Sequence, residues 1–453
     1  MTLKKNNFNI FPRKYSYGGI MDCLIKSIPL ASLYKKTIKI IDLNINKSIN
    51  GDFFIKNISN KNSYKNLNYN NEKIVFNDFE IIFEKIKYIT KLLILRNKFF
   101  SILVKVFFVF FYISPVKAKT KFRLFFNRQN YYNANLDDKN FSYLKSLNIN
   151  LEKGKIQQIY LDRKSFDIIN EEKENLNFKK LNLFELDDNY ICFYIREKKF
   201  NLDNPNLKKN DDVIWYRKKS FLPTLKKIFE NNLKIVDFSL LEENLEIKNK
   251  LYFNLEKLNI KSELINYVIT KHSKFFLSTG GGKSELARLF KKPILRVDHA
   301  YNVINNFDFS TNKDHIIFCN IYSKKRKRFL SIKEQFENLN SLFPYIGNGT
   351  IFNFKFNYQD YIMVENSEEE ILNLFKNYNF NKDVVTKNKN NQKEIFNIKR
   401  YYLEKKSPDY FYNTNVNYPE SPLICVDFFK NTAEYSDYLE LKTKKFNTIL
   451  LQQ

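Results

Sequence analysis

The sequence predicts an α/β protein with two halves, in which parallel strands alternate with helices. Between residues 190 and 378, short apolar runs alternate with segments whose apolar residues recur at helical spacing. This alternation is typical of a parallel sheet with right-handed crossovers. The chain has 453 residues, which is enough for two or three domains because one domain averages about 150 residues. Hydrophobic residues make up 43% of the chain, enough to build cores.

The first half opens with one strand, helix and strand. We expect an extended stretch over 8–11, a turn at Gly18 and Gly19, a helix over 21–34 and a strand over 37–43. The helix is predicted because its apolar residues recur at helical intervals. These residues are Met21, Leu24, Ile25, Ile28 and Leu33. This order of elements is that of an α/β domain.

The second half repeats the pattern more clearly. Strands are predicted over 190–195, 233–238, 274–278, 293–297 and 360–364. Helices are predicted over 221–229, 264–269, 284–290 and 371–378. The last helix follows a capping box formed by Ser367 and Glu370. A Rossmann-like domain is expected, and such domains bind ligands at the carboxyl ends of their strands.

The domain boundaries follow from shifts in composition. We expect an N-terminal α/β domain over 1–185 and a C-terminal Rossmann-like domain over 186–378. An Asn- and Lys-rich linker and an aromatic tail follow over 379–453, and we expect the tail to pack back on the N-terminal domain. No internal repeat of fixed period is apparent.

One apolar segment, 99–116, has basic residues on both flanks and only Lys105 inside it. As a helix it would measure about 27 Å, close to the thickness of a bilayer core. Three interpretations stay open: an interfacial membrane anchor, a buried helix or strand pair, and a membrane span. Apolar runs over 121–127 and 155–161 are further strand candidates of this half. The first residues lack the apolar core of a signal peptide, so we expect a cytoplasmic protein, free or peripheral on the inner membrane face.

The net charge of +27 would suit a nucleic-acid partner, but no recognisable reading motif supports one. Lys, Asn and Ile are abundant and Arg is rare, a composition typical of an AT-rich genome. An anionic membrane or an anionic substrate remains compatible with the charge. The four cysteines form no C-x-x-C pair, and no two of the three histidines are four residues apart. We therefore expect neither a disulfide framework nor a metal site.

The sharpest motif is a glycine loop, STGGGKSE, between a predicted strand and a predicted helix. Three of the nine glycines of the chain stand together in it. Glycine allows close backbone approach, and a helix start with a lysine offers donors and charge, so the loop predicts a diphosphate cradle. The binding residues would be Thr279, Gly280, Gly281, Gly282 and Lys283.

Two other interpretations of the glycine loop stay open. It fits a tight strand-to-helix turn that requires positive φ. It also fits a degenerate P-loop, because Gly282, Lys283 and Ser284 match the end of that motif, although Leu277 stands where its first glycine belongs. The P-loop interpretation would make the chain a phosphotransferase.

Four segments resemble the second half of a family of bacterial glycosyltransferases linked to surface-polysaccharide synthesis. They are YIREKKFN, VIWYRKKSFLPTLKKIFENNLKIVDF, KFFLSTGGGKSELARLFKKPILRVD and YIMVENSEEEILNLFKNY, and the resemblance covers about residues 190–378. The family pattern matches Arg196-Glu197, Tyr216-Arg217, the glycine loop and Glu365-Asn366. The loop departs from the family, which more often has serine and alanine where this chain has three glycines and a lysine.

The resemblance implies a GT-B-like fold, in which two Rossmann-like domains face each other across a cleft and the second holds the donor. From their chemistry and position in the sequence, we expect Arg196 and Arg217 to clamp phosphate and Glu365 to accept the ribose hydroxyls. Asp298, directly after a predicted strand, would line the cleft. Each of these four side chains also fits a solvated surface role. No D-x-D occurs in the chain, which favours metal-independent transfer through helix dipoles and cations.

An inverting transfer needs a base that deprotonates the acceptor hydroxyl. Asp22 is the candidate, because the segment GGIMDCLIKSIPLASL is similar to the opening of heptosyltransferase-like enzymes, where an acid near a glycine turn faces the acceptor. Helix capping or solvent exposure would equally explain Asp22.

The expected function is transfer of a sugar from a nucleotide-diphosphate sugar to a glycan or lipid-linked acceptor in cell-surface polysaccharide synthesis. The nucleotide-sugar is a co-substrate, and no other cofactor is expected. Expected partners are the donor, the acceptor and a membrane surface, without nucleic acid. Two rivals remain: a non-catalytic nucleotide- or glycan-binding protein of the same fold, and the P-loop phosphotransferase.

Overall fold

In the computed structural model the chain divides into two units, Met1–Lys173 and Glu174–Gln453. The structure describes residues 7–10, 17–40, 74–76, 86, 102, 106, 143–151, 189–195, 218–239, 247–258, 263–279, 283–299, 314–331, 334–335, 338–342, 356–380, 423–424 and 432–451. The strand candidates 121–127 and 155–161 lie outside these residues. Of the apolar segment 99–116, only Ile102 and Val106 are described, and both side chains are exposed. Within the described part of the chain, no helix combines the length and apolarity needed to cross a bilayer.

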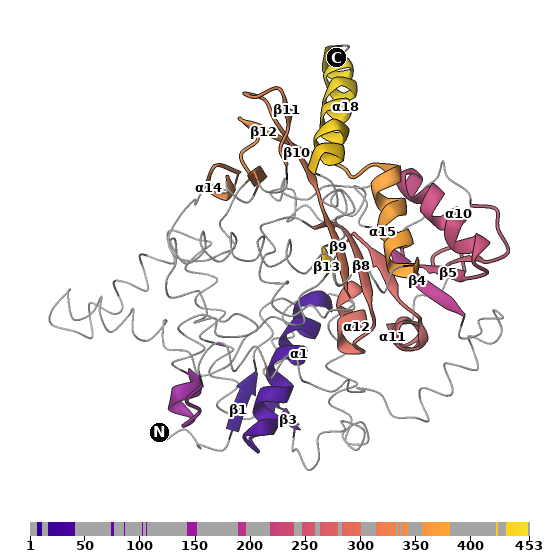
Figure 1. The fold of residues 1–453 in the computed structure, drawn as a ribbon. Helices are drawn as coiled ribbons and strands as arrows, with labels where there is room; N and C mark the ends of the chain where they lie inside the picture. The colour runs from indigo at the N-terminus through magenta and orange to yellow at the C-terminus, as the bar shows by residue number, and fades with distance from the viewer. Residues whose placement is uncertain are drawn as a thin grey trace. The chain divides into compact units, whose positions relative to one another are not determined.

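The first unit contains a small parallel sheet. Strand β1 (Asn7–Ile10), helix α1 (Tyr17–Leu33) and strand β2 (Thr37–Ile40) follow one another, and β3 (Ile74–Phe76) extends the sheet in the order β1-β2-β3 (Figure 1). Both strand pairs are parallel. The predicted strand, helix and strand at the start of the chain are confirmed.

Helix α1 corrects the prediction of a turn at Gly18 and Gly19. The helix begins at Tyr17 and includes both glycines. A glycine inside a helix costs about 1 kcal/mol relative to alanine, and burial of the apolar face of the helix outweighs that cost. The buried residues are Cys23, Leu24, Ile25, Ser27, Ile28, Leu30 and Ala31.

The second unit is built on a parallel sheet of seven strands. In spatial order they are β13 (Leu423–Ile424), β9 (His315–Phe318), β8 (Ile294–His299), β7 (Phe276–Ser278), β4 (Tyr190–Tyr194), β5 (Lys234–Asp237) and β6 (Tyr252–Asn254). All neighbouring pairs are parallel. The chain runs outward from β4 through β5 to β6, returns to the other side of β4 with β7, and continues outward through β8 to β9. This is the order of doubly wound nucleotide-binding sheets, so the predicted α/β class is confirmed for this unit.

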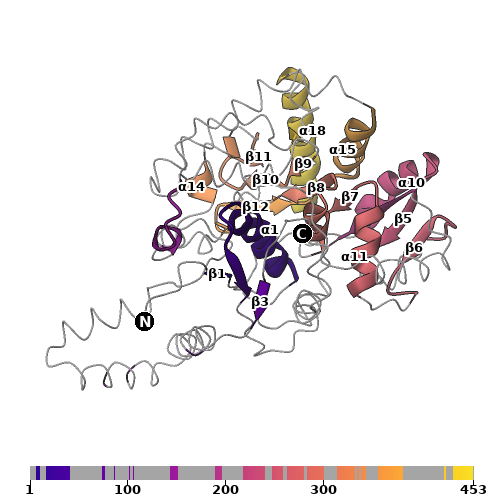
Figure 2. The same ribbon diagram turned by 90° about the horizontal axis from the view of Figure 1, so that it is seen from below.

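Helices cover both faces of this sheet (Figures 1 and 2). Helices α10 (Leu222–Glu230), preceded by the 3-10 turn η3 (Lys218–Phe221), and α15 (Glu368–Phe380) pack on one face, and α11 (Glu263–His272) and α12 (Ser284–Leu289) on the other. The first face holds one large apolar cluster, which includes Phe193, Leu277, Leu295, Phe221, Leu225, Ile371 and Phe375. On the second face, Tyr190 Oη donates to the carbonyl oxygen of Ile269 in α11 at 2.7 Å. Strands buried on both faces explain the continuous apolar runs of the sequence.

A second sheet lies beside the first in this unit. It is antiparallel, with order β11-β10-β12, and consists of β10 (Asn320–Ser323), β11 (Arg328–Phe329) and β12 (Tyr361–Val364). The short helix α14 (Leu339–Leu342) precedes β12 in the chain. The strand predicted over 360–364 is therefore present, but it belongs to this antiparallel sheet and not to the parallel one.

The tail packs within the second unit. Strand β13 pairs with β9, and helix α18 (Thr432–Leu451) packs on β11. Leu439 and Phe446 of α18 bury apolar surface against Tyr322 and Phe329. The expectation that the tail packs on the N-terminal domain is corrected for these two segments, because β13 joins the parallel sheet and α18 packs on the antiparallel sheet of the second unit.

The predicted capping box at the start of α15 is confirmed. Ser367 Oγ accepts the backbone N–H of Glu370 at 3.2 Å, and Glu370 Oε2 accepts the backbone N–H of Ser367 at 2.6 Å. The same carboxylate forms an ion pair with Lys442 of α18, with Nζ to Oε1 at 3.0 Å. One acidic side chain thus begins α15 and joins it to α18.

His315 of β9 makes the stability of the protein sensitive to mild acid. Burial lowers the pKa of His315 from 6.5 to about 4. The unfolded chain therefore binds more protons than the folded chain between these pH values, and stability falls as pH falls through this window, by about 3 kcal/mol in total. Urea unfolding at several pH values should show this loss in the wild type and a smaller one in His315→Leu. An equal loss in both proteins would contradict the prediction.

Candidate functional site

The strand order reverses between β4 and β7. The connection after β4 leads to α10 on one face, and the connection after β7 leads to α12 on the other. In doubly wound sheets, ligands bind outside the carboxyl ends of the two strands at this switch point. The glycine loop starts here, because it directly follows Ser278, which pairs with Tyr194 at the end of β4.

The two flanks of the glycine loop are described, whereas Gly280, Gly281 and Gly282 lie outside the described residues. On the first flank, the backbone N–H of Thr279 donates to the carbonyl oxygen of Tyr194 at 3.2 Å. This hydrogen bond continues the pairing of β7 with β4 by one residue. The loop therefore leaves the sheet beside the carboxyl end of β4.

On the second flank, Lys283 returns to the same edge of the sheet. Its Nζ donates to the carbonyl oxygen of Phe238 at 3.2 Å. The ammonium also lies over two rings, 5.9 Å from the centroid of Tyr194 and 5.5 Å from that of Phe238, distances at which a cation is attracted to an aromatic face. The structure thus brings Thr279 and Lys283 together at the carboxyl ends of β4, β5 and β7.

A buried hydrogen-bond network fixes the backbone beside this cation. Asp237, at the end of β5, accepts hydrogen bonds from the hydroxyl of Tyr252, from Asn254 Nδ2 at 3.2 Å and from the backbone N–H of Ser239 at 2.7 Å. Ser239 Oγ in turn accepts the backbone N–H of Ile195 at 2.9 Å. The carboxylate of Asp237 is fully buried. It therefore orients the segments after β4 and β5 and is not exposed to a ligand.

Between β8 and the first turn of α12 lies a cluster of buried charges that the sequence did not predict. Arg296 of β8 pairs in register with Ser278, the residue just before the loop. Glu285, in the first turn of α12, lies 2.5 Å from Arg288 Nη1 and 3.7 Å from Arg296 Nη2. Burial lowers the pKa of Arg296, and Glu285 opposes that shift. The available signal was an arginine inside PILRV, an otherwise apolar strand.

A second buried carboxylate balances this cluster. Glu285, Arg288 and Arg296 are 8%, 5% and 5% exposed, respectively, and Asp314, which also acts to raise the pKa of Arg296, is 5% exposed. Two guanidinium groups therefore face two carboxylates, and their charges nearly cancel. The cluster joins α12 to β8 and does not itself supply positive charge for an anion.

Glu365 lies beside η3, the 3-10 turn that precedes α10. Its Oε2 accepts a hydrogen bond from Ser220 Oγ of η3 at 3.4 Å, and its backbone oxygen accepts one from Asn320 Nδ2 at 3.3 Å. Arg217, directly before η3, and Arg196, directly after Ile195, lie outside the described residues. Their predicted contacts with phosphate stay predictions.

Asp298 and Asp22 lie in secondary structure whose side chains at these positions are not described. The prediction that Asp298 follows its strand is wrong, because β8 continues to His299. The pairing of β8 with β9 shifts register between Arg296 and His299, which no local apolar pattern reveals. Asp22 lies within α1 of the first unit, and its role as a base stays a prediction.

The described residues provide neither an exposed cysteine nor a cluster of metal-binding side chains. Cys23, Cys192 and Cys319 are buried free thiols. Burial raises the pKa of Cys192 to about 12, which keeps this thiol protonated and unreactive at neutral pH. Among the described side chains, no group of three or more His, Cys, Asp or Glu could hold a metal ion. The described part of the site offers the ammonium group of Lys283 instead.

The chain matches no family model. No curated protein matches it either. Among solved structures, it is similar to UDP-GlcNAc 2-epimerase from Methanocaldococcus jannaschii, with 12% sequence identity and a TM-score of 0.28 over 69% of this chain and 88% of that chain. At this TM-score the similarity carries no weight for the function of this chain.

Proposed function

We propose that the protein is a glycosyltransferase that binds a nucleotide-diphosphate sugar at the switch point of the parallel sheet. The observation that carries the proposal is the position of Lys283, whose ammonium lies at the carboxyl ends of β4 and β5 on the flank of the glycine loop. Ligands of doubly wound sheets bind at this place. A half-buried lysine on the flank of a glycine-rich loop suits an anion.

The chemistry of transfer defines a role for each group. The acceptor hydroxyl attacks the anomeric carbon, the bond to the diphosphate breaks, and the nucleoside diphosphate leaves with the bonding electrons. Lys283 would stabilise the charge that develops on the leaving diphosphate. Asp22, from the first unit, would take the proton of the acceptor hydroxyl.

The donor and acceptor follow from the same proposal. The two units would form a GT-B-like pair with the donor mostly on the second, and Glu365 would accept the ribose hydroxyls. Arg196 and Arg217 would clamp the phosphates through their planar forks. The acceptor would be a glycan or a lipid-linked glycan, in cell-surface polysaccharide synthesis at the cytoplasmic membrane face.

A thermal-shift panel of UDP-, GDP-, ADP- and CMP-linked sugars tests the donor class. A ligand that binds the native state raises the unfolding midpoint by mass action. We expect a shift with at least one of the three diphosphate donors and none with the CMP-linked sugar, which carries a single phosphate. A flat response across all four would count against the proposal, as would a shift with the CMP-linked sugar alone.

Lys283→Met should weaken binding of the responding donor about thirty-fold, because a hydrogen bond to a charged group contributes about 2 kcal/mol. Isothermal titration would measure the change. The matched control is Lys234→Met, since Lys234 is also half-buried but begins β5 at the opposite edge of the sheet. Equal effects of the two substitutions would contradict the assignment. Magnesium-dependent ATP hydrolysis that Lys283→Met abolishes would instead identify a phosphotransferase.

A further inference from the structure

The turn between β10 and β11 and the first residue of β11 together carry five consecutive basic residues, which we call the basic hairpin. They are Lys324, Lys325, Arg326, Lys327 and Arg328, and all five are exposed. Two of the twelve arginines of the chain stand among them, so lysine-rich composition alone does not account for the run. The basic hairpin lies in the antiparallel sheet, away from the glycine loop in the topology of the unit.

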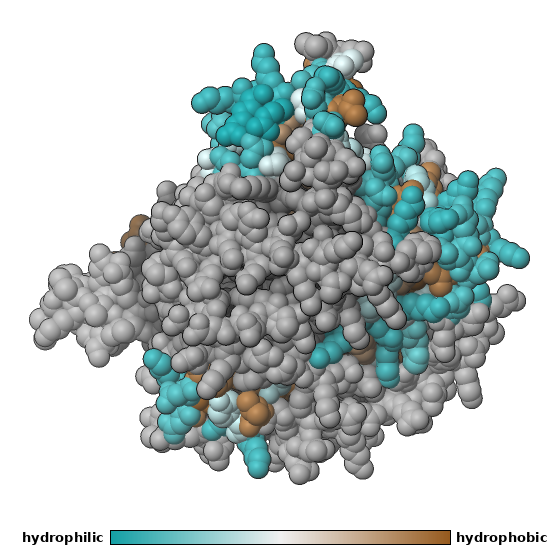
Figure 3. Space-filling view, viewed as in Figure 1, coloured by the Kyte–Doolittle hydropathy of each residue, from teal (hydrophilic) through white to brown (hydrophobic). Residues whose placement is uncertain are grey.

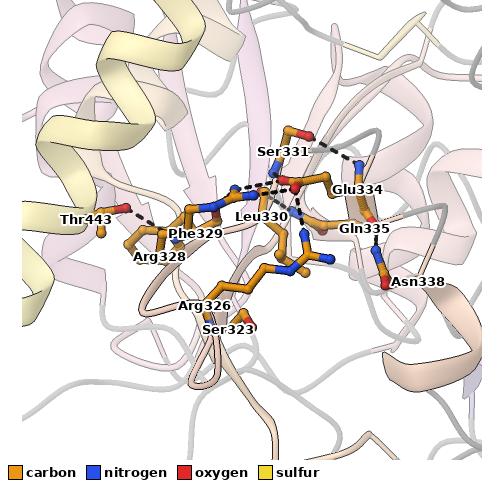
Figure 4. Close-up of polar contacts among 10 residues, drawn as sticks. All are labelled: Ser323, Arg326, Arg328, Phe329, Leu330, Ser331, Glu334, Gln335, Asn338 and Thr443. Atoms are coloured by element: carbon orange, nitrogen blue, oxygen red, sulfur yellow. Dashed lines mark hydrogen bonds and ion pairs between the residues drawn. The ribbon is translucent and has the colours of Figure 1, made fainter.

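One carboxylate holds the two arginines of the basic hairpin in place (Figure 4). Glu334 Oε1 forms ion pairs with Arg326 Nη1 at 2.7 Å and with Arg328 Nη2 at 2.5 Å, and Oε2 accepts from Arg328 Nη1 at 2.9 Å. Glu334 also forms a reciprocal capping box with Ser331. Burial acts to raise the pKa of Glu334, but Arg328, Ser331 and Arg326 outweigh it and lower that pKa to about 2.

Two of the three lysines of the basic hairpin stay available to a partner, whereas Lys324 Nζ donates to the carbonyl oxygen of Tyr358 at 2.6 Å. Lys325 and Lys327 form no side-chain hydrogen bond or ion pair with the residues that the structure describes. Among the residues that the structure describes, the carboxylate that forms ion pairs with these five basic side chains is that of Glu334. The remaining positive charge of the basic hairpin therefore faces solvent, and the contacts described above and below fix the backbone of the hairpin.

Aromatic packing fixes the basic hairpin on the C-terminal half of α18. The ring centroid of Phe446 lies 4.9 Å from that of Tyr322 and 5.3 Å from that of Phe329. Asn447 accepts a hydrogen bond from Tyr322 Oη at 2.5 Å and donates one to the carbonyl oxygen of Lys327 at 3.3 Å. The turn of the hairpin and the end of α18 are thus neighbours, as Figure 1 also shows.

The end of α18 adds exposed aliphatic surface next to this charge. Ile449 and Leu450 follow Asn447 closely in the helix and are 52% and 37% exposed. Figure 3 shows hydrophilic residues at this end of the unit with apolar ones beside them. Basic residues around a few exposed aliphatic side chains are typical of proteins that dock on the surface of an anionic membrane.

We propose that the basic hairpin and the last turns of α18 form a docking surface for an anionic phospholipid bilayer. The lysines contact lipid phosphates, and Ile449 and Leu450 enter the headgroup boundary. A single-stranded nucleic acid fits this surface less well, because its successive bases stack on several exposed aromatic rings. Tyr322 and Phe329 are only 4% and 1% exposed, and Tyr358, whose carbonyl oxygen accepts a hydrogen bond from Lys324 Nζ, is 41% exposed. That ring could stack with one base, whereas the two exposed aliphatic side chains of α18 suit the headgroup boundary of a bilayer. Docking does not depend on the transferase activity proposed above.

Vesicle co-sedimentation of the full chain tests the docking surface. The protein should bind phosphatidylcholine vesicles that contain phosphatidylglycerol, and not pure phosphatidylcholine vesicles. The double variant Lys325→Gln and Lys327→Gln should bind the anionic vesicles about thirty-fold more weakly, because each basic residue near the surface contributes about one factor of five. Added salt should reduce wild-type binding in the same way.

A charge-matched control separates this surface from the general positive charge of the chain. The double variant Lys226→Gln and Lys250→Gln removes the same charge from exposed positions elsewhere in the unit, and its binding should stay close to that of the wild type. Ile449→Ser with Leu450→Ser should weaken binding at unchanged charge. Equal losses in the two lysine variants would overturn the proposal. The proposal would also be overturned if the double variant Lys325→Gln and Lys327→Gln lost binding to a single-stranded oligonucleotide but bound the anionic vesicles as tightly as the wild type.

Discussion

Glu285→Gln should lower the free energy of unfolding of the protein by about 3 to 5 kcal/mol, the usual cost of removing one partner from a buried ion pair. The carboxylate of Glu285 lies 2.5 Å from Arg288 and 3.7 Å from Arg296, and the two arginine side chains are 4% and 7% exposed. Glutamine has nearly the same shape, so packing changes little. The substitution leaves two buried guanidinium groups facing each other without the charge that lies between them.

Arg296→Met is the informative companion to that substitution. Methionine fills much of the volume of arginine and removes one of the two cations, while Glu285 and Arg288 keep their ion pair. We therefore expect a change of at most about 1 kcal/mol, since replacing buried charge by well-packed apolar groups is often neutral. Urea unfolding with an unchanged m-value would measure both variants. Similar losses for both would show that packing, and not charge balance, governs this cluster.

Glu370→Gln should lower the free energy of unfolding by about 3 kcal/mol, because it also removes one partner from a buried ion pair, here where the two sheets meet. The carboxylate of Glu370 is 4% exposed. It accepts hydrogen bonds from Asn320 of β10 at 2.9 Å and from the backbone of Ser367 at 2.6 Å, and it contacts Lys442 of α18 at 3.0 Å. Loss of its charge leaves Lys442, whose side chain is 14% exposed, without its counterion. The helix α18 should then be held less firmly.

The control for Glu370 is its neighbour in the same helix. Glu369 is exposed, so Glu369→Gln should change stability by less than about 0.5 kcal/mol. Hydrogen exchange of the α18 amides should accelerate in Glu370→Gln and stay unchanged in Glu369→Gln. Matching exchange rates in the two variants would contradict the role of Glu370 as the link between α15 and α18.

The contribution of Glu370 to the stability of the protein decreases in acid. Burial acts to raise the pKa of Glu370, but Lys442, Ser367 and Asn320 outweigh it and hold that pKa below 4.5. The charge of Glu370 therefore stabilises the protein fully at pH values above the pKa of this group in the unfolded chain. This stabilisation is lost as pH falls through the lower pKa of Glu370 in the folded protein. This loss occurs in stronger acid than the loss caused by His315.

The amino-acid sequence by itself determined those features whose causes lie within a few neighbouring residues. Apolar periodicity predicted α1, α10 and α11, and continuous apolar runs predicted the central strands. The capping box of Ser367 and Glu370 forms over four residues. The glycine loop was found because unusual residues stand between two recognisable elements, and a strand followed by a loop and a helix is a local pattern.

Only the tertiary structure decided which elements become neighbours. The switch point between β4 and β7, the membership of β12 in an antiparallel sheet and the contact of α18 with β11 join segments far apart in the chain. Arg296 is a further example of a contact that the sequence pattern does not reveal, because Glu285 in α12 lies beside it only after β8 has joined the sheet. Helical and strand patterns are set by backbone geometry over one or two turns, whereas the pairing of strands and the balance of buried charges depend on burying the whole apolar surface at once.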